Sequence, residues 1–196
     1  MPSAPPLAAE HAGEASDERG AAEKGTALRP PTIAVPLAIA AAALALATYP
    51  SGAEGVIAAF AAAVLVVLAA IDIDRRLIPN RIVLPSFALV LLAQIAFYPH
   101  HTVEWLASAA IGAGALLLPR LISRAWMGMG DVKMMLLVGA ALGWPVAGAL
   151  LLAFAAVFPV SLVLLVRGGK AARKATIPFG PFLALGGLIE LLVPHL

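Results

Sequence analysis

Residues 56–97 read VIAAFAAAVLVVLAAIDIDRRLIPNRIVLPSFALVLLAQIAF, two long apolar runs separated by a short segment that carries two aspartates and three arginines. Each run approaches the roughly 20 apolar residues that a helix needs to cross a bilayer. The same alternation of apolar run and short polar break continues along the chain. It is typical of a polytopic membrane protein and not of a single soluble core.

The composition supports this interpretation. Of the 196 residues 62% are hydrophobic and 12% are charged, and the mean hydropathy is +0.97. Soluble domains are roughly half apolar and a quarter charged, so an ordinary cytosolic domain is excluded. The formal net charge of +2 is scattered between apolar runs without a basic stripe, and no nucleic-acid partner is predicted. The chain has no cysteine, which excludes disulfides, thiolate zinc sites and cysteine nucleophiles.

We predict an all-α membrane helix bundle with about seven spans. The candidate spans are residues 33–49, 54–72, 81–98, 103–122, 131–144, 145–166 and 177–194. With seven crossings, all 13 lysines and arginines fall on one face of the membrane. The positive-inside rule predicts that this face is cytoplasmic. The N-terminus is then inside and the C-terminus outside. Residues 1–31 are predicted to be a disordered cytoplasmic tail. Residues 32–196 then form the membrane domain, an extra first span at 33–49 followed by a core from about 54 to 196.

The run at residues 131–144 is short. Fourteen helical residues extend about 21 Å, whereas the bilayer core is about 30 Å thick. Either the helix continues through Trp144 and Pro145, or its N-terminal end lies below the cytoplasmic surface. The second alternative places Asp131 in a recess that water can reach.

Two aspartates lie where a carboxylate is costly, at the cytoplasmic ends of apolar spans, and this makes Asp72 and Asp131 candidates for a functional site. Asp74 points about 200° around the helix from Asp72, so the two cannot face one cavity. Two carboxyls that converge on one water would form an aspartic-protease dyad, in which one polarises a carbonyl and the other deprotonates the water. The spacing alone leaves open whether they meet; two unrelated topology signals are the alternative.

Two glycines precede Asp131. We expect Gly128 and Gly130 to adopt sparsely allowed backbone conformations and to let a partner strand approach without interference from a Cβ atom.

Three strings resemble the type IV prepilin peptidases, in the order of that family. They are Asp72 followed by six residues and Pro79-Asn80, then GMGDVK at 128–133, which resembles the motif of the GxGD aspartic proteases, then IPFGP at 177–181. The resemblance implies a membrane endopeptidase of the bacterial inner membrane. It would remove the short basic leader from prepilin-like proteins at the cytoplasmic face, with Asp72 and not Asp74 paired with Asp131.

The same motifs mark supporting residues, namely Pro79, Asn80, Gly128, Gly130, Lys133, Pro178 and Gly180. Lys133 either tunes the dyad or contacts substrate, or it is a cation that extends to the membrane surface. Pro79-Asn80 most simply ends the connector and caps the following helix, orienting Asp72 indirectly. The segment at Pro178 either lines a substrate groove or only starts a helix. The spacing of Gly139 and Gly143 fits close helix packing.

The larger bifunctional members of the family carry an N-terminal domain with paired cysteines and a methyltransferase activity. The chain shows neither, so we expect the short peptidase-only form that accompanies tight-adherence (Flp) pili, with no methyltransferase activity implied. No cofactor and no metal are expected, since His100-His101 lacks a third ligand. The expected partners are prepilins and pseudopilins with an apolar N-terminal helix, membrane lipid and pilus assembly proteins.

Three other functions compete with the peptidase. One is a catalytically silent scaffold of a pilus assembly complex, and the intact motifs argue against it. A membrane transporter or proton relay would use Asp131, Lys133 and Glu190, although such sites usually lie near the bilayer midplane. An intramembrane-cleaving GxGD protease would hold its first aspartate in the middle of a helix.

Overall fold

The structure is a computed structural model that describes residues 32–49, 52–123, 127–172 and 178–193. The predicted tail at 1–31 lies outside the described residues, as does Ile177, the first residue of the third motif.

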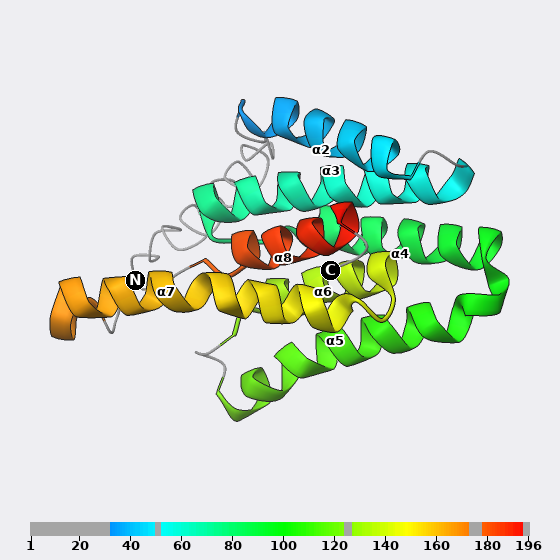
Figure 1. The fold of residues 1–196 in the computed structure, drawn as a ribbon. Helices are drawn as coiled ribbons and strands as arrows, with labels where there is room; N and C mark the ends of the chain where they lie inside the picture. The colour runs from blue at the N-terminus through cyan, green and yellow to red at the C-terminus, as the bar shows by residue number, and fades with distance from the viewer. Residues whose placement is uncertain (1–31, 50–51, 124–126, 173–177, 194–196) are drawn as a thin grey trace, which may run out of the picture.

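The described chain is helical throughout. Its elements are α2 (Ala34–Thr48), α3 (Gly52–Arg75), α4 (Asn80–Phe97), the short 3-10 helix η1 (Pro99–His101), α5 (Thr102–Ile122), α6 (Met129–Leu142), α7 (Val146–Ala172) and α8 (Gly180–Leu192). The all-α prediction is confirmed, and each of the seven predicted runs corresponds to one α-helix. α7 continues to Ala172, past the predicted end of its run at residue 166, and in Figure 1 this end projects beyond the other helices.

Length separates the helices into two groups. Four described helical stretches are long and apolar enough to cross a membrane, namely Gly52–Arg75, Asn80–Phe97, Pro99–Ile122 and Val146–Leu164. α2, α6 and α8 have 15, 14 and 13 residues. At 1.5 Å per residue they extend roughly 20–23 Å, less than the hydrocarbon thickness of about 30 Å. The seven-span prediction is therefore right for the number of helices, and length alone supports a crossing for four of them.

Consecutive helices run in opposite directions, so the bundle has two ends (Figure 1). α3 ends, and α6 and α8 begin, at the end that carries Asp72 and Asp131, which we name the aspartate end. The other end carries Glu54, Glu104 and Glu190, and we name it the glutamate end. The cations near the termini of the described helices are at the aspartate end: Arg75, Arg76, Arg81, Arg120, Lys133 and Arg167.

The short helix α6 lies in the middle of the bundle. Its buried residues are Asp131, Val132, Met134, Met135, Leu137, Val138, Gly139 and Ala140. A Cβ atom on Gly139 would lie 2.6 Å from the Cα atom of Ala109 in α5, so the two helices pack backbone to backbone, as the glycine spacing predicts. α6 ends at Leu142 because Gly143 takes φ 70° and turns the chain. The alternative in which this helix continues through Pro145 is therefore wrong.

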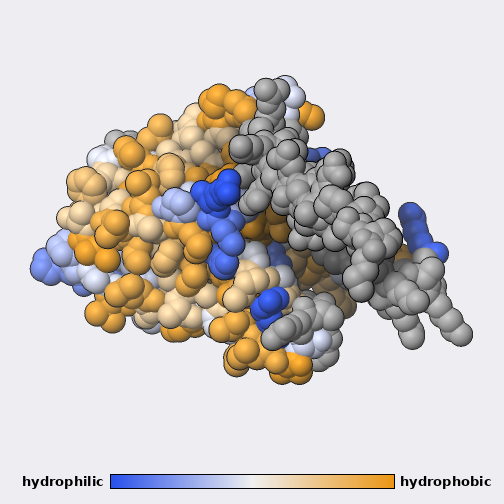
Figure 2. All heavy atoms as spheres, turned by 180° about the vertical axis from the view of Figure 1, so that it is seen from behind, coloured by the Kyte–Doolittle hydropathy of each residue, from blue (hydrophilic) through white to orange (hydrophobic). Residues whose placement is uncertain are grey.

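The outer surface is largely apolar. Figure 2 shows one broad face on which hydrophobic residues dominate and hydrophilic ones form small patches. Large apolar side chains are exposed on several helices, among them Leu92 on α4, Leu118 on α5 and Leu151 on α7. An exposed apolar surface this extensive is expected where lipid is the solvent.

Candidate active site

Asp72 lies in the last turn of α3 and is only 6% exposed. The helix ends just beyond it, since Arg76 adopts φ 51°, a conformation that few residues other than glycine take. The chain then extends through a short connector to Pro79, whose φ of −73° and ψ of 125° are extended, and α4 starts at Asn80. The connector therefore begins one turn after Asp72.

Asp131 is in the first turn of α6 and is 9% exposed. The glycines before it do not adopt unusual backbone conformations: Gly128 has φ −70° and ψ 142°, and Gly130 has no positive φ. That part of the prediction is wrong. The glycines provide space instead, because a Cβ atom on Gly128 would lie 2.8 Å from Oδ2 of Asp131, and one on Gly130 would lie 2.8 Å from Cβ of Ile78. The approach of a partner strand is not tested, since in the described residues the segment that comes close to Gly130 is the connector at Ile78.

The two carboxyl groups line one pocket of about 420 Å³ at the aspartate end. Its other lining residues are Arg76, Leu77, Ile78, Asn80, Gly128, Met129, Gly130 and Lys133. Residues 59 positions apart in the sequence thus line the same pocket at the helix ends.

Asp74 does not share this pocket. Its side chain is 61% exposed, and its nearest charged partner is Arg75, with Nε to Oδ2 at 3.7 Å. The prediction that Asp72 and Asp74 face different directions on α3 is confirmed.

The start of α8 contacts Asp72. A Cβ atom on Gly180 would lie 2.6 Å from Oδ2 of Asp72, so only glycine leaves room for this carboxyl. Oδ2 of Asp72 is buried and has no hydrogen-bond partner in the described part of the chain. A buried oxygen without a partner costs free energy, and such an atom is suited to bind a water or a substrate group.

Pro178 is half-buried and is not among the residues that line the pocket. The neighbouring Phe179 packs on Phe154 of α7, with ring centroids 5.3 Å apart. The third motif therefore contacts the site through Gly180, and its aromatic residue fixes α8 to α7.

Lys133 and Asn80 contact each other across the site. The Nζ atom of Lys133 donates a hydrogen bond to Oδ1 of Asn80 at 2.8 Å. Pro79 occupies the N-cap position of α4, and no side chain there makes a capping hydrogen bond. Pro79-Asn80 therefore ends the connector at the start of α4, as predicted, but supplies no capping hydrogen bond. Asn80 lies in the first turn of α4, and its side-chain oxygen accepts a hydrogen bond from Lys133 of α6 instead.

One contact has no signal in the sequence. Nη1 of Arg120, in the last turn of α5, donates to the backbone oxygen of Met127 at 2.7 Å. This bond ties the segment just before Gly128 to α5. Sequence reasoning assigned Arg120 only to the charge pattern of the cytoplasmic face.

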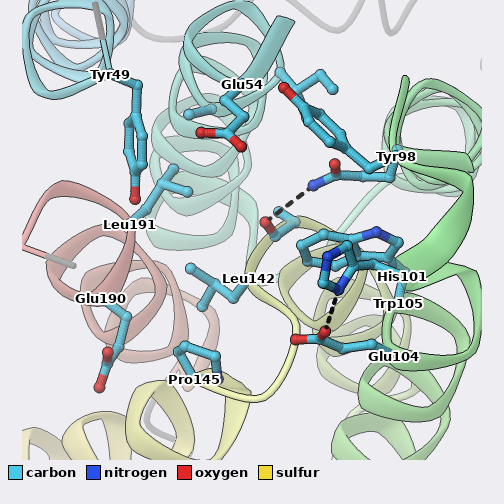
Figure 3. Close-up of a pocket in the computed structure, with 14 residues that line it drawn as sticks. Tyr49, Glu54, Tyr98, His101, Glu104, Trp105, Leu142, Pro145, Glu190 and Leu191 are labelled. Atoms are coloured by element: carbon cyan, nitrogen blue, oxygen red, sulfur yellow. Dashed lines mark hydrogen bonds and ion pairs between the residues drawn. The ribbon is translucent and has the colours of Figure 1, made fainter. Parts of the chain in front are cut away.

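A second pocket, of about 320 Å³, lies at the glutamate end (Figure 3). Glu54, Glu104 and Glu190 line it, together with aromatic residues that include Tyr49. Glu190 is ten residues from Gly180 along α8, about 15 Å. The structure thus does not bring Glu190 together with Asp131 and Lys133, as one relay site would require.

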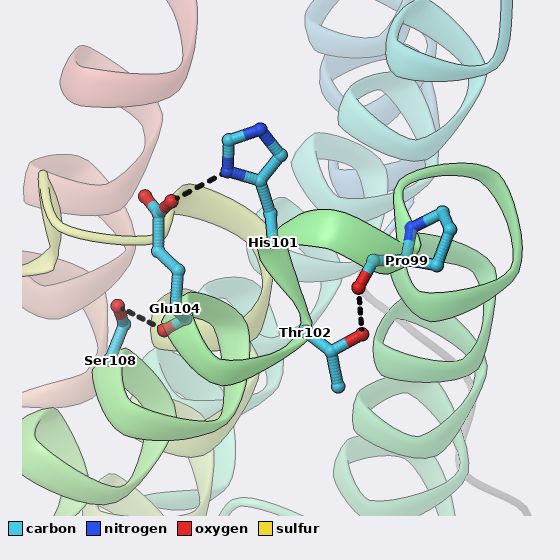
Figure 4. Close-up of polar contacts among 5 residues, drawn as sticks. All are labelled: Pro99, His101, Thr102, Glu104 and Ser108. Atoms are coloured by element: carbon cyan, nitrogen blue, oxygen red, sulfur yellow. Dashed lines mark hydrogen bonds and ion pairs between the residues drawn. The ribbon is translucent and has the colours of Figure 1, made fainter.

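His101 takes part in the start of α5 (Figure 4). Its Nδ1 atom lies 3.0 Å from Oε2 of Glu104, while Thr102 Oγ1 donates to the oxygen of Pro99 and Ser108 Oγ donates to the oxygen of Glu104. The contact of His101 with Glu104 gives the histidine a local structural role at the start of α5. Within the described ranges no group of three histidine, cysteine, aspartate or glutamate residues is arranged to hold a metal ion.

The sequence matches one known protein family. The sequence profile of the type IV leader peptidase family matches residues 59–166, more than half of the 196 residues, and the match includes Asp72 and Asp131. No solved structure gives a significant match.

Several curated relatives are named prepilin leader peptidase/N-methyltransferase. The one from Burkholderia pseudomallei (strain 1026b) is 36% identical over 168 residues, which cover 79% of this chain and 51% of the relative. The one from Aeromonas salmonicida (strain A449) is 36% identical over 143 residues, covering 66% and 46%. The one from Stutzerimonas stutzeri is 32% identical over 133 residues, covering 65% and 46%. The chain spans about half the length of these relatives.

Proposed function

This chain belongs to the type IV leader peptidase family, and from that premise we propose that it is a membrane aspartic endopeptidase that removes the leader from prepilin-like proteins. The observation that carries the proposal is the shared pocket of about 420 Å³ that Asp72 and Asp131 line, two buried carboxyls from distant segments of the chain. Buried paired carboxyls have little use in packing and a direct use in acid–base catalysis.

In the proposed reaction one carboxylate takes a proton from the attacking water while the other carboxyl, protonated, donates to the oxygen of the scissile carbonyl. The water oxygen bonds to the carbonyl carbon and gives a tetrahedral diol. When the diol collapses, the C–N bond breaks and the leaving nitrogen takes the proton that the first aspartate received. One hydroxyl of the diol returns its proton to the second aspartate, which restores both carboxyl groups to their starting states. The unpartnered Oδ2 atom of Asp72 offers a place for either the water or the carbonyl oxygen.

The substrate would lie with its leader on the cytoplasmic side and its apolar helix in the bilayer. The concentration of cations at the aspartate end supports this orientation, because positive charge marks the cytoplasmic face. Leu77 and Met129, which are 61% and 45% exposed, give the pocket an apolar rim where the first residues of such a helix could bind. Binding of the helix remote from the cut bond would contribute to positioning that bond.

The proposal concerns the peptidase reaction, and a tight-adherence (Flp) prepilin is the first substrate to test. The position of Asp72 in the last turn of α3, and not in its middle, favours cleavage at the membrane boundary over cleavage within the bilayer. The glutamate-end position of Glu190 gives no support to a proton relay with Asp131.

The test is cleavage of a small Flp-type prepilin co-expressed in membranes with the wild type or with Asp72→Asn, Asp131→Asn or Asp74→Asn. The first two substitutions should reduce cleavage by at least about 10²-fold, the contribution of a general acid or base. Asp74→Asn is the matched control, since Asp74 is exposed two residues away, and it should cut normally. Normal cleavage by Asp72→Asn and Asp131→Asn would overturn the two-aspartate mechanism. If the wild type leaves the prepilin uncut, the assignment of an Flp-type prepilin as substrate is overturned.

A further inference from the structure

Two contacts outside the carboxyl groups join the segment that follows Asp72, namely the connector and the start of α4, to the segment that carries Asp131. Ile78 of the connector packs on Gly130. A Cβ atom placed on Gly130 would lie 2.8 Å from the Cβ atom of Ile78. Nζ of Lys133 donates to Oδ1 of Asn80 at 2.8 Å. The second contact joins residues 53 positions apart in the sequence and is the one polar link between these segments among the described residues.

We propose that Lys133 and Asn80 form a positioning pair that fixes the separation of Asp72 and Asp131, an inference that rests on the proposed function. Lys133 is two residues after Asp131 in α6, so its backbone moves with that aspartate. Asn80 begins α4 directly after the short connector that leads from α3. The hydrogen bond therefore ties the start of α4, which the connector joins to the helix of Asp72, to α6, the helix of Asp131.

The choice of partner by Lys133 distinguishes positioning from electrostatic tuning. Its ammonium group hydrogen-bonds to an amide oxygen and forms no ion pair with Asp72 or Asp131, although all four residues line the pocket. A neutral acceptor leaves both carboxyls available for the water. A bond from a charged donor is also stronger than a neutral one, which suits a link that must keep two helices in register.

The pair explains two motif residues whose roles the sequence leaves open. Asn80 does not cap α4, and Lys133 does more than add a charge to one face of the bundle. The remaining contact, Ile78 on Gly130, is apolar and non-directional. Without the hydrogen bond the connector keeps that contact but can slide along α6, and an error of about 1 Å between catalytic groups can cost about 10²-fold in rate.

A double-mutant cycle tests the pair. The purified full chain and a prepilin substrate give kcat and KM for Asn80→Ala, Lys133→Met and the double variant. We expect each single variant to lose about 10²-fold in kcat with little change in KM, since the loss is of alignment and not of substrate binding. The double variant should be no slower than the slower single one, because both remove the same bond.

Two further variants control the experiment. Lys133→Arg keeps a cationic donor and should recover much of the lost kcat. Arg81→Met removes a cation directly beside Asn80 that makes no hydrogen bond or ion pair with other described residues, and it should behave as the wild type. Losses that multiply in the double variant, or a rise in KM with kcat unchanged, would overturn the positioning pair.

A distance measurement separates this inference from the proposed function. The chain has no cysteine, so spin labels attached through Leu77→Cys and Met129→Cys report the spacing of connector and α6 directly. The distance distribution should broaden in Lys133→Met and not in Arg81→Met. An unchanged distribution would overturn the pair whatever reaction the protein catalyses, whereas failure of the wild type to cut prepilin would overturn only the proposed function.

Discussion

Replacing Gly180 with alanine adds one methyl group beside the Asp72 carboxyl. The new Cβ atom would lie 2.6 Å from Oδ2, 3.0 Å from Cγ and 3.3 Å from Cβ of Asp72. Non-bonded carbon contacts are most favourable at about 3.5–4.0 Å, so the three distances are all too short. The added methyl group would therefore crowd the whole side chain of Asp72 and not only its carboxyl oxygen.

The expected size of the effect follows from these distances. Restoring normal contact requires the Asp72 carboxyl to move by about 1 Å relative to α8. It is 6% exposed and cannot swing into solvent, so it must turn within the pocket or push α8 away. A displacement of about 1 Å at a reacting group lowers the rate by about 10²-fold. The crowding itself should cost about 1–3 kcal/mol of stability.

The assay is the initial rate of prepilin cleavage by purified Gly180→Ala, with thermal unfolding in detergent measured on the same sample. Gly114→Ala is the matched control, because Gly114 is also helical and a Cβ atom there has nothing within 4 Å. The control should cut at the wild-type rate and be as stable or slightly more stable, since alanine is the better helix former. A wild-type rate for Gly180→Ala would refute the placement of Asp72 against α8.

Three other substitutions test the fold and the site. Gly139→Ala should lower the unfolding temperature, since its Cβ would meet the Ala109 backbone at 2.6 Å and overpacking costs about 1–3 kcal/mol; an unchanged melting temperature would contradict the close packing of α5 and α6. Arg120→Leu should reduce kcat by about tenfold, because it frees the Met127 oxygen and with it the segment before Gly128; a change in KM alone would argue against this positioning role. His101→Ala should leave cleavage unchanged, as it lies at the glutamate end, and a loss of activity restored by added zinc would show a metal role.

Much of the fold could be predicted because each membrane helix is a local pattern. The seven helices follow from apolar runs of set length, and their ends fall within a few residues of the predicted ones except at α7, which continues past its apolar run into charged residues. The choice between Asp72 and Asp74 could also be made locally, from the 100° that each helical residue turns. What could not be predicted is whether α6 continues, since the φ of 70° at Gly143 is a property of the folded turn.

By itself the sequence determined the helical class, the order of the helices and the gathering of cations near alternate helix ends, since these depend on hydropathy, spacing and charge along the chain. The tertiary structure alone decided that Asp72 and Asp131 share one pocket, that Gly180 makes room for one of them, and that Lys133 bonds to Asn80. These contacts join segments dozens of residues apart. Their distances depend on how whole helices pack, and no local pattern of residues encodes that packing.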